Sequence, residues 1–209
     1  MQQAAAIGLT YLAAWLGLVE YARLVPGETL LVIGANGGVG SAVAQIGKWR
    51  GARVIGADRQ KRREDVSATT VFEEFFVLEA KPLEERVREA TNDRGADVVF
   101  DSVGGPMFEP GLKALAHRGR QLEIASAVDR RVSFDLIDFY HNEGQLFGVD
   151  TRARDATASA ALLEGLMPFF EQDTFRPPSI DRVVALADGR SAYDEVDRGQ
   201  VRGRIVLTP

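Results

Sequence analysis

A glycine-rich junction between a strand pattern and a helix pattern constrains this chain more than any other feature. An apolar run at Thr29–Ile33 leads into Gly34-Ala35-Asn36-Gly37-Gly38-Val39-Gly40, and an apolar helical pattern follows from Ser41. Glycines at such a turn let a ligand approach the backbone, and the first N–H groups of the helix attract an anion. We therefore expect the amides of residues 35–40 to be free to bind a diphosphate.

A turn of this kind can also serve packing alone, so a second feature is needed to favour a nucleotide. Asp58 supplies it, because it lies eighteen residues after Gly40, at the end of the next predicted strand. An acidic side chain at that place accepts hydrogen bonds from the ribose hydroxyls of an adenosine. Together the two features predict a dinucleotide site.

Two other nucleotide-binding classes are excluded by their missing motifs. A P-loop needs Gly-Lys followed by Ser or Thr, whereas Gly47-Lys48 is followed by Trp49. A short-chain dehydrogenase needs a tyrosine with a lysine four residues later, and none of the four tyrosines has one.

The pattern along the chain alternates short β-rich runs with longer helical segments, which is typical of parallel strands joined by crossover helices. It predicts an α/β fold of Rossmann type: a doubly wound, mostly parallel sheet in three layers. The expected strands are residues 29–33, 53–57, 75–78, 97–101, 120–125, 145–149 and 204–208. The expected helices are residues 4–23, 38–50, 82–92, 107–116, 155–172 and 188–198.

Composition narrows the class of protein further. With 209 residues, 45% hydrophobic, and a net charge of −5, the chain fits one soluble domain that does not bind nucleic acid. There is no cysteine and there are two histidines, so we expect no metal site. The apolar stretch at residues 4–19 is shorter than the roughly 20 residues of a membrane span, and no basic residue precedes it. We expect a buried helix, no membrane contact and a cytoplasmic protein.

Three motifs resemble one family. They are the glycine-rich turn at residues 35–40, VVFDSVGG at residues 98–105, and RGRIVLTP at residues 202–209. Together with PGET at residues 26–29 they are similar to the medium-chain dehydrogenase/reductase superfamily, in its zinc-independent, quinone oxidoreductase-like branch.

The resemblance implies a domain organisation and an activity. Members begin with a GroES-like catalytic lobe, so residues 1–209 correspond to the nicotinamide dinucleotide-binding domain with a flanking helix and a C-terminal strand, and the lobe is absent. The implied activity is NAD(P)H-dependent hydride transfer to a small-molecule substrate, a quinone or an activated alkene. The alternative is a nonenzymatic dinucleotide-binding or dimerisation module. A homodimer is implied, with the strand at residues 145–149 contributing to the contact.

The resemblance also assigns cofactor contacts residue by residue. The turn that would bind the diphosphate comprises Ala35, Asn36, Gly37, Gly38, Val39 and Gly40. Asp58 and Arg59 correspond to the contacts with the adenosine, and Ser102 and Val103 to the segment beside the ribose and nicotinamide. The residues that match the lining of the nicotinamide are Ala125, Ser126, Phe147, Gly148 and Val149. No catalytic proton donor is assigned. Relatives carry a threonine where this chain has Ala13, and Thr10, one helical turn earlier, is a candidate substitute.

The choice between the two nicotinamide cofactors rests on conflicting signals. Asp58 favours NAD(H), because a carboxylate repels a 2′-phosphate, whereas the basic cluster at Arg59, Lys61, Arg62 and Arg63 favours NADP(H). Relatives mostly use NADPH, so we expect NADP(H), with NAD(H) as the alternative.

The remaining polar candidates have structural roles in this interpretation. His117 and His141 are expected at the surface, and Asp101 is expected to cap a glycine turn.

Overall fold

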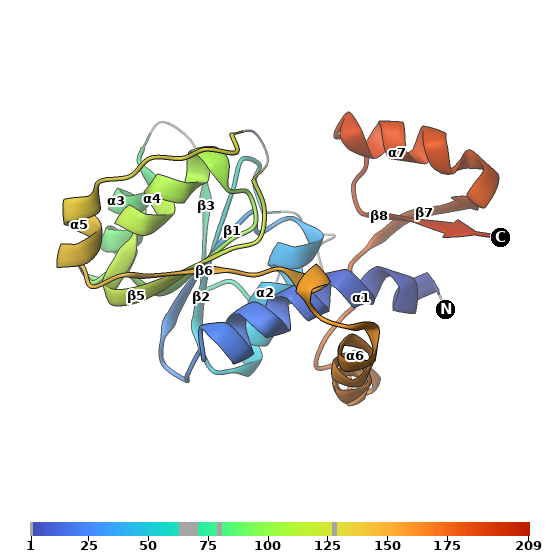
Figure 1. The fold of residues 1–209 in the computed structure, drawn as a ribbon, viewed down its shortest axis with the longest axis horizontal. Helices are drawn as coiled ribbons and strands as arrows, with labels where there is room; N and C mark the ends of the chain where they lie inside the picture. The colour runs from blue at the N-terminus through green and yellow to red at the C-terminus, as the bar shows by residue number, and fades with distance from the viewer. Residues whose placement is uncertain (1, 63–70, 79–80, 127–128) are drawn as a thin grey trace.

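A computed structural model describes residues 2–62, 71–78, 81–126 and 129–209 (Figure 1). The strands are β1 Thr29–Ile33, β2 Arg53–Asp58, β3 Glu74–Val77, β4 Ala96–Asp101, β5 Leu115–Glu123, β6 Gln145–Gly148, β7 Ile180–Ala185 and β8 Arg204–Thr208. The α-helices are α1 Gln2–Trp15, α2 Gly38–Trp49, α3 Leu83–Ala90, α4 Phe108–Lys113, α5 Leu136–His141, α6 Ala156–Glu171 and α7 Gly189–Asp197.

The main sheet has six parallel strands in the order β3-β2-β1-β4-β5-β6. Chain order runs outward in both directions from β1, so the crossover direction reverses between β1 and β4. This confirms the predicted doubly wound fold of Rossmann type. Such sheets bind ligands outside the carboxyl ends of the strands at the reversal point, and here that point lies between the segments that follow Ile33 and Asp101.

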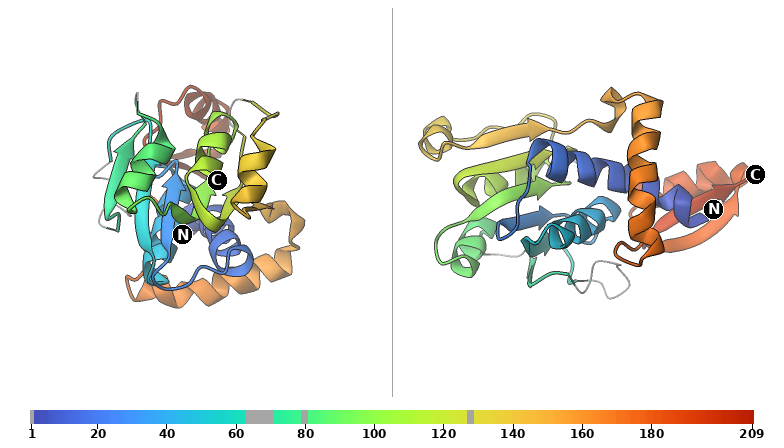
Figure 2. Two further views of the ribbon diagram at one scale, coloured as in Figure 1. Left: turned by 90° about the vertical axis from the view of Figure 1, so that its left-hand side faces the viewer. Right: turned by 90° about the horizontal axis from the view of Figure 1, so that it is seen from below.

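Helices cover both faces of the sheet, which gives the three predicted layers (Figure 2). Leu30 and Val32 of β1 pack in the core shared with α1 and α2. Leu31 and Ile33, which point to the other face, pack with Leu83 of α3 and its neighbours. β1 is fully buried along its whole length, which explains why its sequence is continuously apolar instead of alternating.

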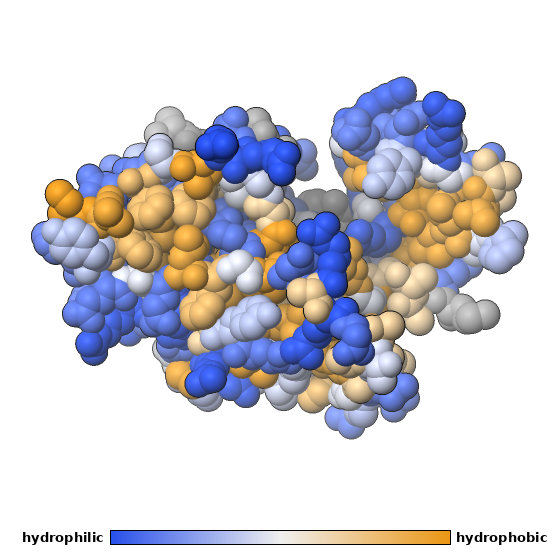
Figure 3. Space-filling model, in the orientation of Figure 1, coloured by the Kyte–Doolittle hydropathy of each residue, from blue (hydrophilic) through white to orange (hydrophobic). Residues whose placement is uncertain are grey.

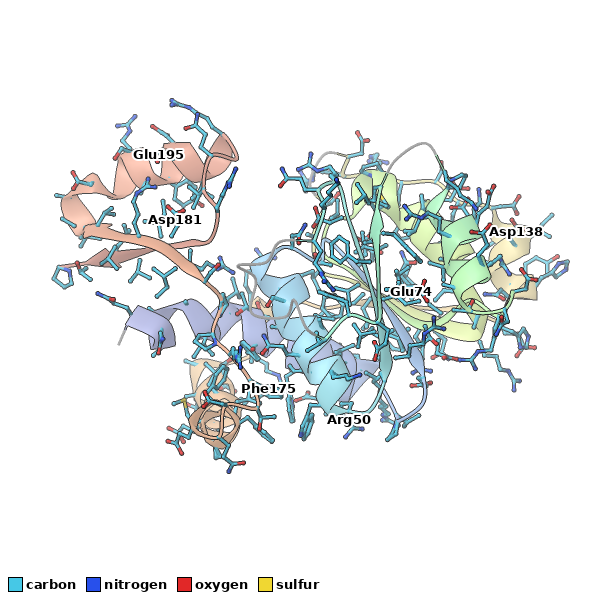
Figure 4. All side chains as sticks on the ribbon, turned by 180° about the vertical axis from the view of Figure 1, so that it is seen from behind. Arg50, Glu74, Asp138, Phe175, Asp181 and Glu195 are labelled. Atoms are coloured by element: carbon cyan, nitrogen blue, oxygen red, sulfur yellow. The ribbon has the colours of Figure 1, made fainter. Side chains whose placement is uncertain are left out.

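The N-terminal helix belongs to the core. Residues Gln2–Tyr21 are long and apolar enough to span a membrane by composition, but 56% of that window is buried inside the fold. After α1 the helix continues as a π-helical turn at Leu16–Tyr21, where Gly17 lies directly against the ring of Phe100. Phe175, which follows α6, contacts the ring of Tyr11 in α1 (Figure 4). α1 thus lies between α6 and the main sheet.

The C-terminal part forms a second, two-stranded parallel sheet from β7 and β8, beside the main sheet and covered by α7 (Figure 1). The expected strand at residues 204–208 is confirmed as β8, and it pairs with β7 instead of joining the main sheet. β7 was not predicted, because its exposed positions alternate with half-buried ones and include Asp181. Arg182 of β7 forms ion pairs with Asp181 and with Glu195 of α7 (Figure 4).

Two other features differ from the expectation, the start of β5 and the presence of a short helix after it. β5 begins at Leu115, five residues earlier than expected, so that His117 lies within the strand. The strand is irregular there, since Arg118 has a φ of 64° and the register with β4 shifts between Ala96 and Val98. The short helix α5 was not expected; Asp135 caps it by accepting hydrogen bonds from the amides of Ile137 and Asp138.

Candidate functional site

A cavity of about 430 Å³ lies between the main sheet and the β7–β8 unit. Its walls come from the glycine turn after β1, from the segments after β4 and β5, and from the chain on either side of β7. The residues that line it are Asn36, Gly37, Gly38, Val39, Ser41, Ser102, Ile124, Ala125, Pro178, Ser179, Val201, Gly203 and Arg204. The cavity therefore lies where the strand order reverses.

The backbone of the glycine turn is partly engaged by the protein itself. The amide of Ala35 donates to the carbonyl of Ala57 at 3.1 Å, the amide of Asn36 to Asp58, and the amide of Gly37 to the carbonyl of Gly34 at 3.0 Å. The expectation that all amides of residues 35–40 are free was thus wrong for the first three. The amides of Gly38, Val39 and Gly40, in the first turn of α2, have no preceding helical turn to bond and can serve an anion, whereas the amide of Ser41 donates to the carbonyl of Gly37 at 2.9 Å.

Glycine is required at two positions of this turn for different reasons. A Cβ at Gly40 would lie 2.3 Å from the carbonyl oxygen of Gly34 and 2.9 Å from Cα of Ala35. Since both neighbours are backbone, Gly40 lets α2 pack against the end of β1. A Cβ at Gly38 would instead meet side chains, 2.9 Å from Nη2 of Arg204 and 3.2 Å from Cγ2 of Thr10. Gly38 therefore lets the Arg204 guanidinium approach the start of α2.

Arg204 is a site residue that the sequence did not reveal. It begins β8, so its guanidinium reaches the glycine turn from the second sheet. It is the one ionisable side chain among the described residues that line the cavity. A guanidinium next to a helix N-terminus favours a ligand with negative charge, and a diphosphate has both the charge and the geometry. The signal in the sequence is the RGRIVLTP motif, whose first half had no assigned role.

The end of β2 forms the side of the site expected to hold the adenosine. Asp58 Oδ2 accepts a hydrogen bond from the amide of Asn36 at 3.0 Å, and Oδ1 accepts one from the amide of Gln60 at 3.2 Å. The side-chain amide of Asn36 donates to the carbonyls of Gln60 and Lys61. Asp58 thus stabilises the turn, although neither Asp58 nor Arg59 lines the cavity. Arg59, Lys61 and Arg62 are exposed beside it, while Arg63 lies outside the described residues.

The segment after β4 forms the opposite wall. The hydroxyl of Ser102 donates to the carbonyl of Ile33 at 2.7 Å, which ties the end of β4 to the end of β1. Asp101 caps the following turn as predicted, since one carboxylate oxygen accepts from the amides of Val103 and Gly104 at 2.8 and 2.9 Å. The structure therefore brings Ser102 to the cavity, with Val103 beside it in the turn.

Two carboxyl groups close to this wall have altered acidity. Burial raises the pKa of Asp101, although its two amide donors oppose the shift. Burial raises the pKa of Glu123 to about 8, and the nearby charge of Asp101 adds to the effect, while a hydrogen bond from Gln121 opposes it. Neither side chain lines the cavity.

The remaining sequence-predicted contacts divide into two groups. Ala125 lines the cavity, and Ser126 follows it at the surface. Phe147, Gly148 and Val149 do not line it: the ring of Phe147 stacks on Tyr21, while Val149 is buried in the core. Their contact with a cofactor stays a prediction.

The other polar candidates do not reach the cavity. Thr10 is fully buried, and its hydroxyl donates to the carbonyl of Ile7 in its own helix at 2.9 Å. It does not line the cavity as a substitute for the missing threonine. His117 and His141 are exposed, as expected.

The comparison with known families decides the assignment. Residues 38–165, more than half of the chain, match the sequence pattern of the family described as zinc-binding dehydrogenase. The chain belongs to this family. It is the cofactor-binding half of a medium-chain dehydrogenase/reductase, because its solved neighbours contain the same fold within longer chains.

Three relatives illustrate how far the similarity extends. An NAD-dependent alcohol dehydrogenase superimposes with a TM-score of 0.88 at 28% identity, over 100% of this chain and 59% of the other. A quinone oxidoreductase from Pseudomonas syringae gives 0.83 at 25% identity, over 100% and 65%. The phthioceranic/hydroxyphthioceranic acid synthase of Mycobacterium tuberculosis is 38% identical over 122 residues, or 58% of this chain and 6% of the synthase.

This dehydrogenase domain therefore spans less than two thirds of the relatives it matches. The family description includes zinc, but the donor set of this chain does not fit a zinc site. There is no cysteine in the sequence, and the described residues contain no group of three histidine, aspartate or glutamate side chains that could hold a metal. Zinc ligation in proteins rests on these donors, so no step is assigned to a metal.

Proposed function

We propose that this chain binds NADP(H) in the cavity at the strand reversal and serves as the cofactor-binding half of an oxidoreductase. The observation that carries the proposal is the meeting of Gly38, the N-terminus of α2 and the Arg204 guanidinium in one cavity. A diphosphate fits a place that combines a residue without a side chain, the positive end of a helix dipole and a fixed cation. The reduced nicotinamide supplies the hydride once it is bound; the protein orients it.

The proposed substrate class is a quinone or an alkene activated by a carbonyl group. Hydride adds to the electrophilic carbon, and a proton completes the reduction. Similarity to a quinone oxidoreductase supports this class of acceptor. In the described part of the cavity, Arg204 is the sole ionisable group and is a poor acid. The proton must therefore come from solvent or from another part of the active enzyme.

A nonenzymatic dinucleotide-binding or dimerisation module is the second candidate. The same lack of an acid in the cavity favours it, together with the exposed apolar face of the β7–β8 unit (Figure 3). Leu186, Val183 and Leu207 lie exposed on that unit. In a complete oxidoreductase we expect a GroES-like lobe against this face.

For the adenosine end, we propose NADP(H) over NAD(H). Arg59, Lys61 and Arg62 are exposed next to Asp58 and can pair with a 2′-phosphate. Both oxygens of Asp58 already accept backbone N–H bonds, which reduces its repulsion of that phosphate. The carboxylate nevertheless suits a ribose hydroxyl, so NAD(H) remains the alternative.

The function is tested by titrating the chain with NADPH and NADH and following nicotinamide fluorescence. The proposal requires saturable binding, tighter for NADPH. If neither cofactor binds, it is wrong. Turnover with a quinone or an enone then separates the two candidates, because a binding module oxidises no NADPH. Turnover by this chain would exclude the module, and binding without turnover would favour it.

The assembly and location are also proposals. We propose a homodimer through β6, which is an edge strand of the main sheet and exposes Gln145 and Leu146. Unpaired strand edges readily accept a second copy. Light scattering of wild type and Leu146→Lys tests this: a dimer that becomes a monomer supports the contact, and a wild-type monomer contradicts it. A cytoplasmic location, without membrane or nucleic-acid partners, completes the proposal.

A further inference from the structure

A buried cluster of polar side chains lies behind the cavity wall. Asp101 ends β4 and is fully buried, and it is in register with Glu123, which ends β5. Residues in register on neighbouring strands point to the same face of a sheet. Gln121, two residues before Glu123, shares this face and donates to the carbonyl of Phe108 in α4. The three side chains therefore lie together between the sheet and α4.

Asp101 has one satisfied oxygen and one unsatisfied oxygen. Oδ1 accepts from the amides of Val103 and Gly104, whereas Oδ2 is buried and has no hydrogen-bond partner among the described residues. A buried carboxylate oxygen without a donor is costly. A donor next to Oδ2 would remove that cost.

Glu123, which is in register with Asp101 on the neighbouring strand, is the titratable side chain that we assign as the donor. Two neighbouring carboxyl groups that are shielded from water do not both ionise readily. Asp101 keeps the negative charge because two amides stabilise it, whereas Glu123 accepts one hydrogen bond, from the neutral amide of Gln121. Burial and the charge of Asp101 keep Glu123 protonated at neutral pH, with a pKa of about 8.

The elements around the pair add little charge. β1 places Ile33 in register with Asp101, and β6 places Gly148 in register with Glu123. On α4, Glu109 forms an ion pair with Lys113 at 3.0 Å. The segment after β5 brings the backbone of Asp129 against Gly105. The titratable groups that face one another in the cluster are thus Asp101 and Glu123, with Glu109 and Asp129 as the next carboxyl groups on the packed segments.

We propose that Asp101 and Glu123 share one proton and that this proton holds the Ser102–Gly105 turn in place as a wall of the cofactor cavity. With the proton present, the Glu123 hydroxyl donates to Asp101 Oδ2, and Oδ1 stays aligned with the two amides of the turn. When the proton leaves, two adjacent buried anions repel each other and this alignment is lost. Both side chains are positioning residues, because neither touches the cavity.

The Ser102–Gly105 turn can pass a change at Asp101 on to the cavity wall because it packs tightly against the segment after β5. Gly104 has a φ of 65°, and a Cβ there would lie 2.0 Å from the carbonyl oxygen of Ala125, another residue of the cavity wall. Gly104 thus packs closely against the backbone of Ala125, and a shift of the turn toward Ala125 would press on this part of the wall. The link to cofactor affinity rests on the proposed function, whereas the shared proton does not.

The shared proton is tested directly by infrared titration of the chain without cofactor. We expect the C=O band of a protonated carboxyl group to persist at pH 7 and to disappear around pH 8. The band should be absent from Glu123→Gln and retained in Glu85→Gln, a matched loss of one exposed carboxylate on α3. Absence of the band from the wild type at pH 7, or its persistence in Glu123→Gln, would overturn the proposal.

The positioning role is tested by the pH dependence of NADPH affinity. Above pH 8 the wild type should lose affinity by up to about tenfold per pH unit, as one linked proton requires. Glu123→Gln carries a permanent neutral donor, so its affinity should stay constant over the same range, while Glu85→Gln should follow the wild type. A profile in Glu123→Gln that is identical to wild type removes the positioning role. If NADPH binds at no pH, the proposed function fails, but the infrared result still decides on the proton.

Discussion

The guanidinium of Arg204 lies directly over Gly38, with Nη2 2.9 Å from the position that a Cβ at residue 38 would take. Gly38 begins α2, directly after the main-sheet strand β1, whereas Arg204 begins β8 of the second sheet, near the other end of the chain. Their contact places a cation at the N-terminus of α2, where phosphate groups bind in folds of this kind. The cavity thus combines a backbone donor set with a side chain that no local sequence motif connects to it.

Arg204→Gln should weaken cofactor binding without unfolding the protein. Loss of a charge-assisted contact to a diphosphate removes about 1.5–3 kcal/mol, or at least a tenfold increase in Kd. Calorimetric titration with NADPH measures the change. Arg198→Gln, which removes an exposed arginine at the end of α7, should leave the Kd unchanged. Equal binding by Arg204→Gln and wild type would exclude Arg204 from the site.

Gly40→Ala should destabilise the fold, because the added Cβ meets the carbonyl oxygen of Gly34 and Cα of Ala35. Neither backbone atom can move away without shifting β1 or α2, so we expect a loss of about 2 kcal/mol or more. Thermal unfolding followed by circular dichroism measures it. Gly165→Ala is the opposite control: it lies within α6 with open space around it, and should stabilise by about 0.5–1 kcal/mol. Equal melting temperatures for Gly40→Ala and wild type would contradict the packing role.

Glu28→Gln should lower stability at neutral pH by about 2 kcal/mol, because it leaves Arg120 without its partner. Both side chains are largely buried and make two hydrogen bonds, at 2.8 and 2.9 Å. Burial raises the pKa of Glu28, but the hydrogen bonds and charge of Arg120 and the Val25 amide outweigh it, so the pKa is lowered. The stabilisation is therefore present above the ordinary glutamate pKa and is lost as pH falls through the lowered value.

Urea unfolding of Glu28→Gln and wild type across acidic pH checks this sign. The difference in unfolding free energy should shrink as the pH falls. A difference that grows toward acid pH would contradict the ion pair. Glu143→Gln, which breaks the exposed pair with Arg118, should have no measurable effect at any of these pH values.

Asp58→Asn should shift cofactor preference further toward NADPH. The substitution retains an acceptor for the amide of Asn36 but removes the charge near a 2′-phosphate. Two unit charges about 4 Å apart in water interact by about 1 kcal/mol, so the ratio of the NADPH and NADH affinities should change about fivefold. Arg59→Gln should change the ratio in the opposite direction. Fluorescence titration with both cofactors measures the ratio, and no change with Asp58→Asn would place the adenosine ribose elsewhere.

The part of the site built from neighbouring residues was predictable, because its chemistry is local. Gly40 packs under β1, Asp58 ends β2, and Asp101 caps its turn, each as the sequence indicated. The fold was predictable for the same reason, since buried parallel strands have continuous apolar runs bounded by glycine. The assignment of contacts to Phe147–Val149 came from resemblance alone, and the cavity does not include them.

What the sequence did not predict depends on long-range packing. Arg204 reaches Gly38 only because β8 pairs with β7 instead of joining the main sheet. β7 itself is half exposed and contains Asp181 and Arg182, so no apolar run marks it. The Asp101–Glu123 pair depends on the register between β4 and β5, which no spacing along the chain reveals.

The cavity lies between two sheets that share no hydrogen-bonded strand pair in the described parts of the chain. Their relative orientation therefore depends on packing across α1 and on the hydrogen bonds that Tyr11 of α1 and Gln45 of α2 make with the backbone of Arg176, ahead of β7. A ligand that contacts both the glycine turn and Arg204 adds a bridge that neither sheet provides. A diphosphate bound as we propose would therefore hold the two sheets together, because separating them would break its contacts with one side or the other.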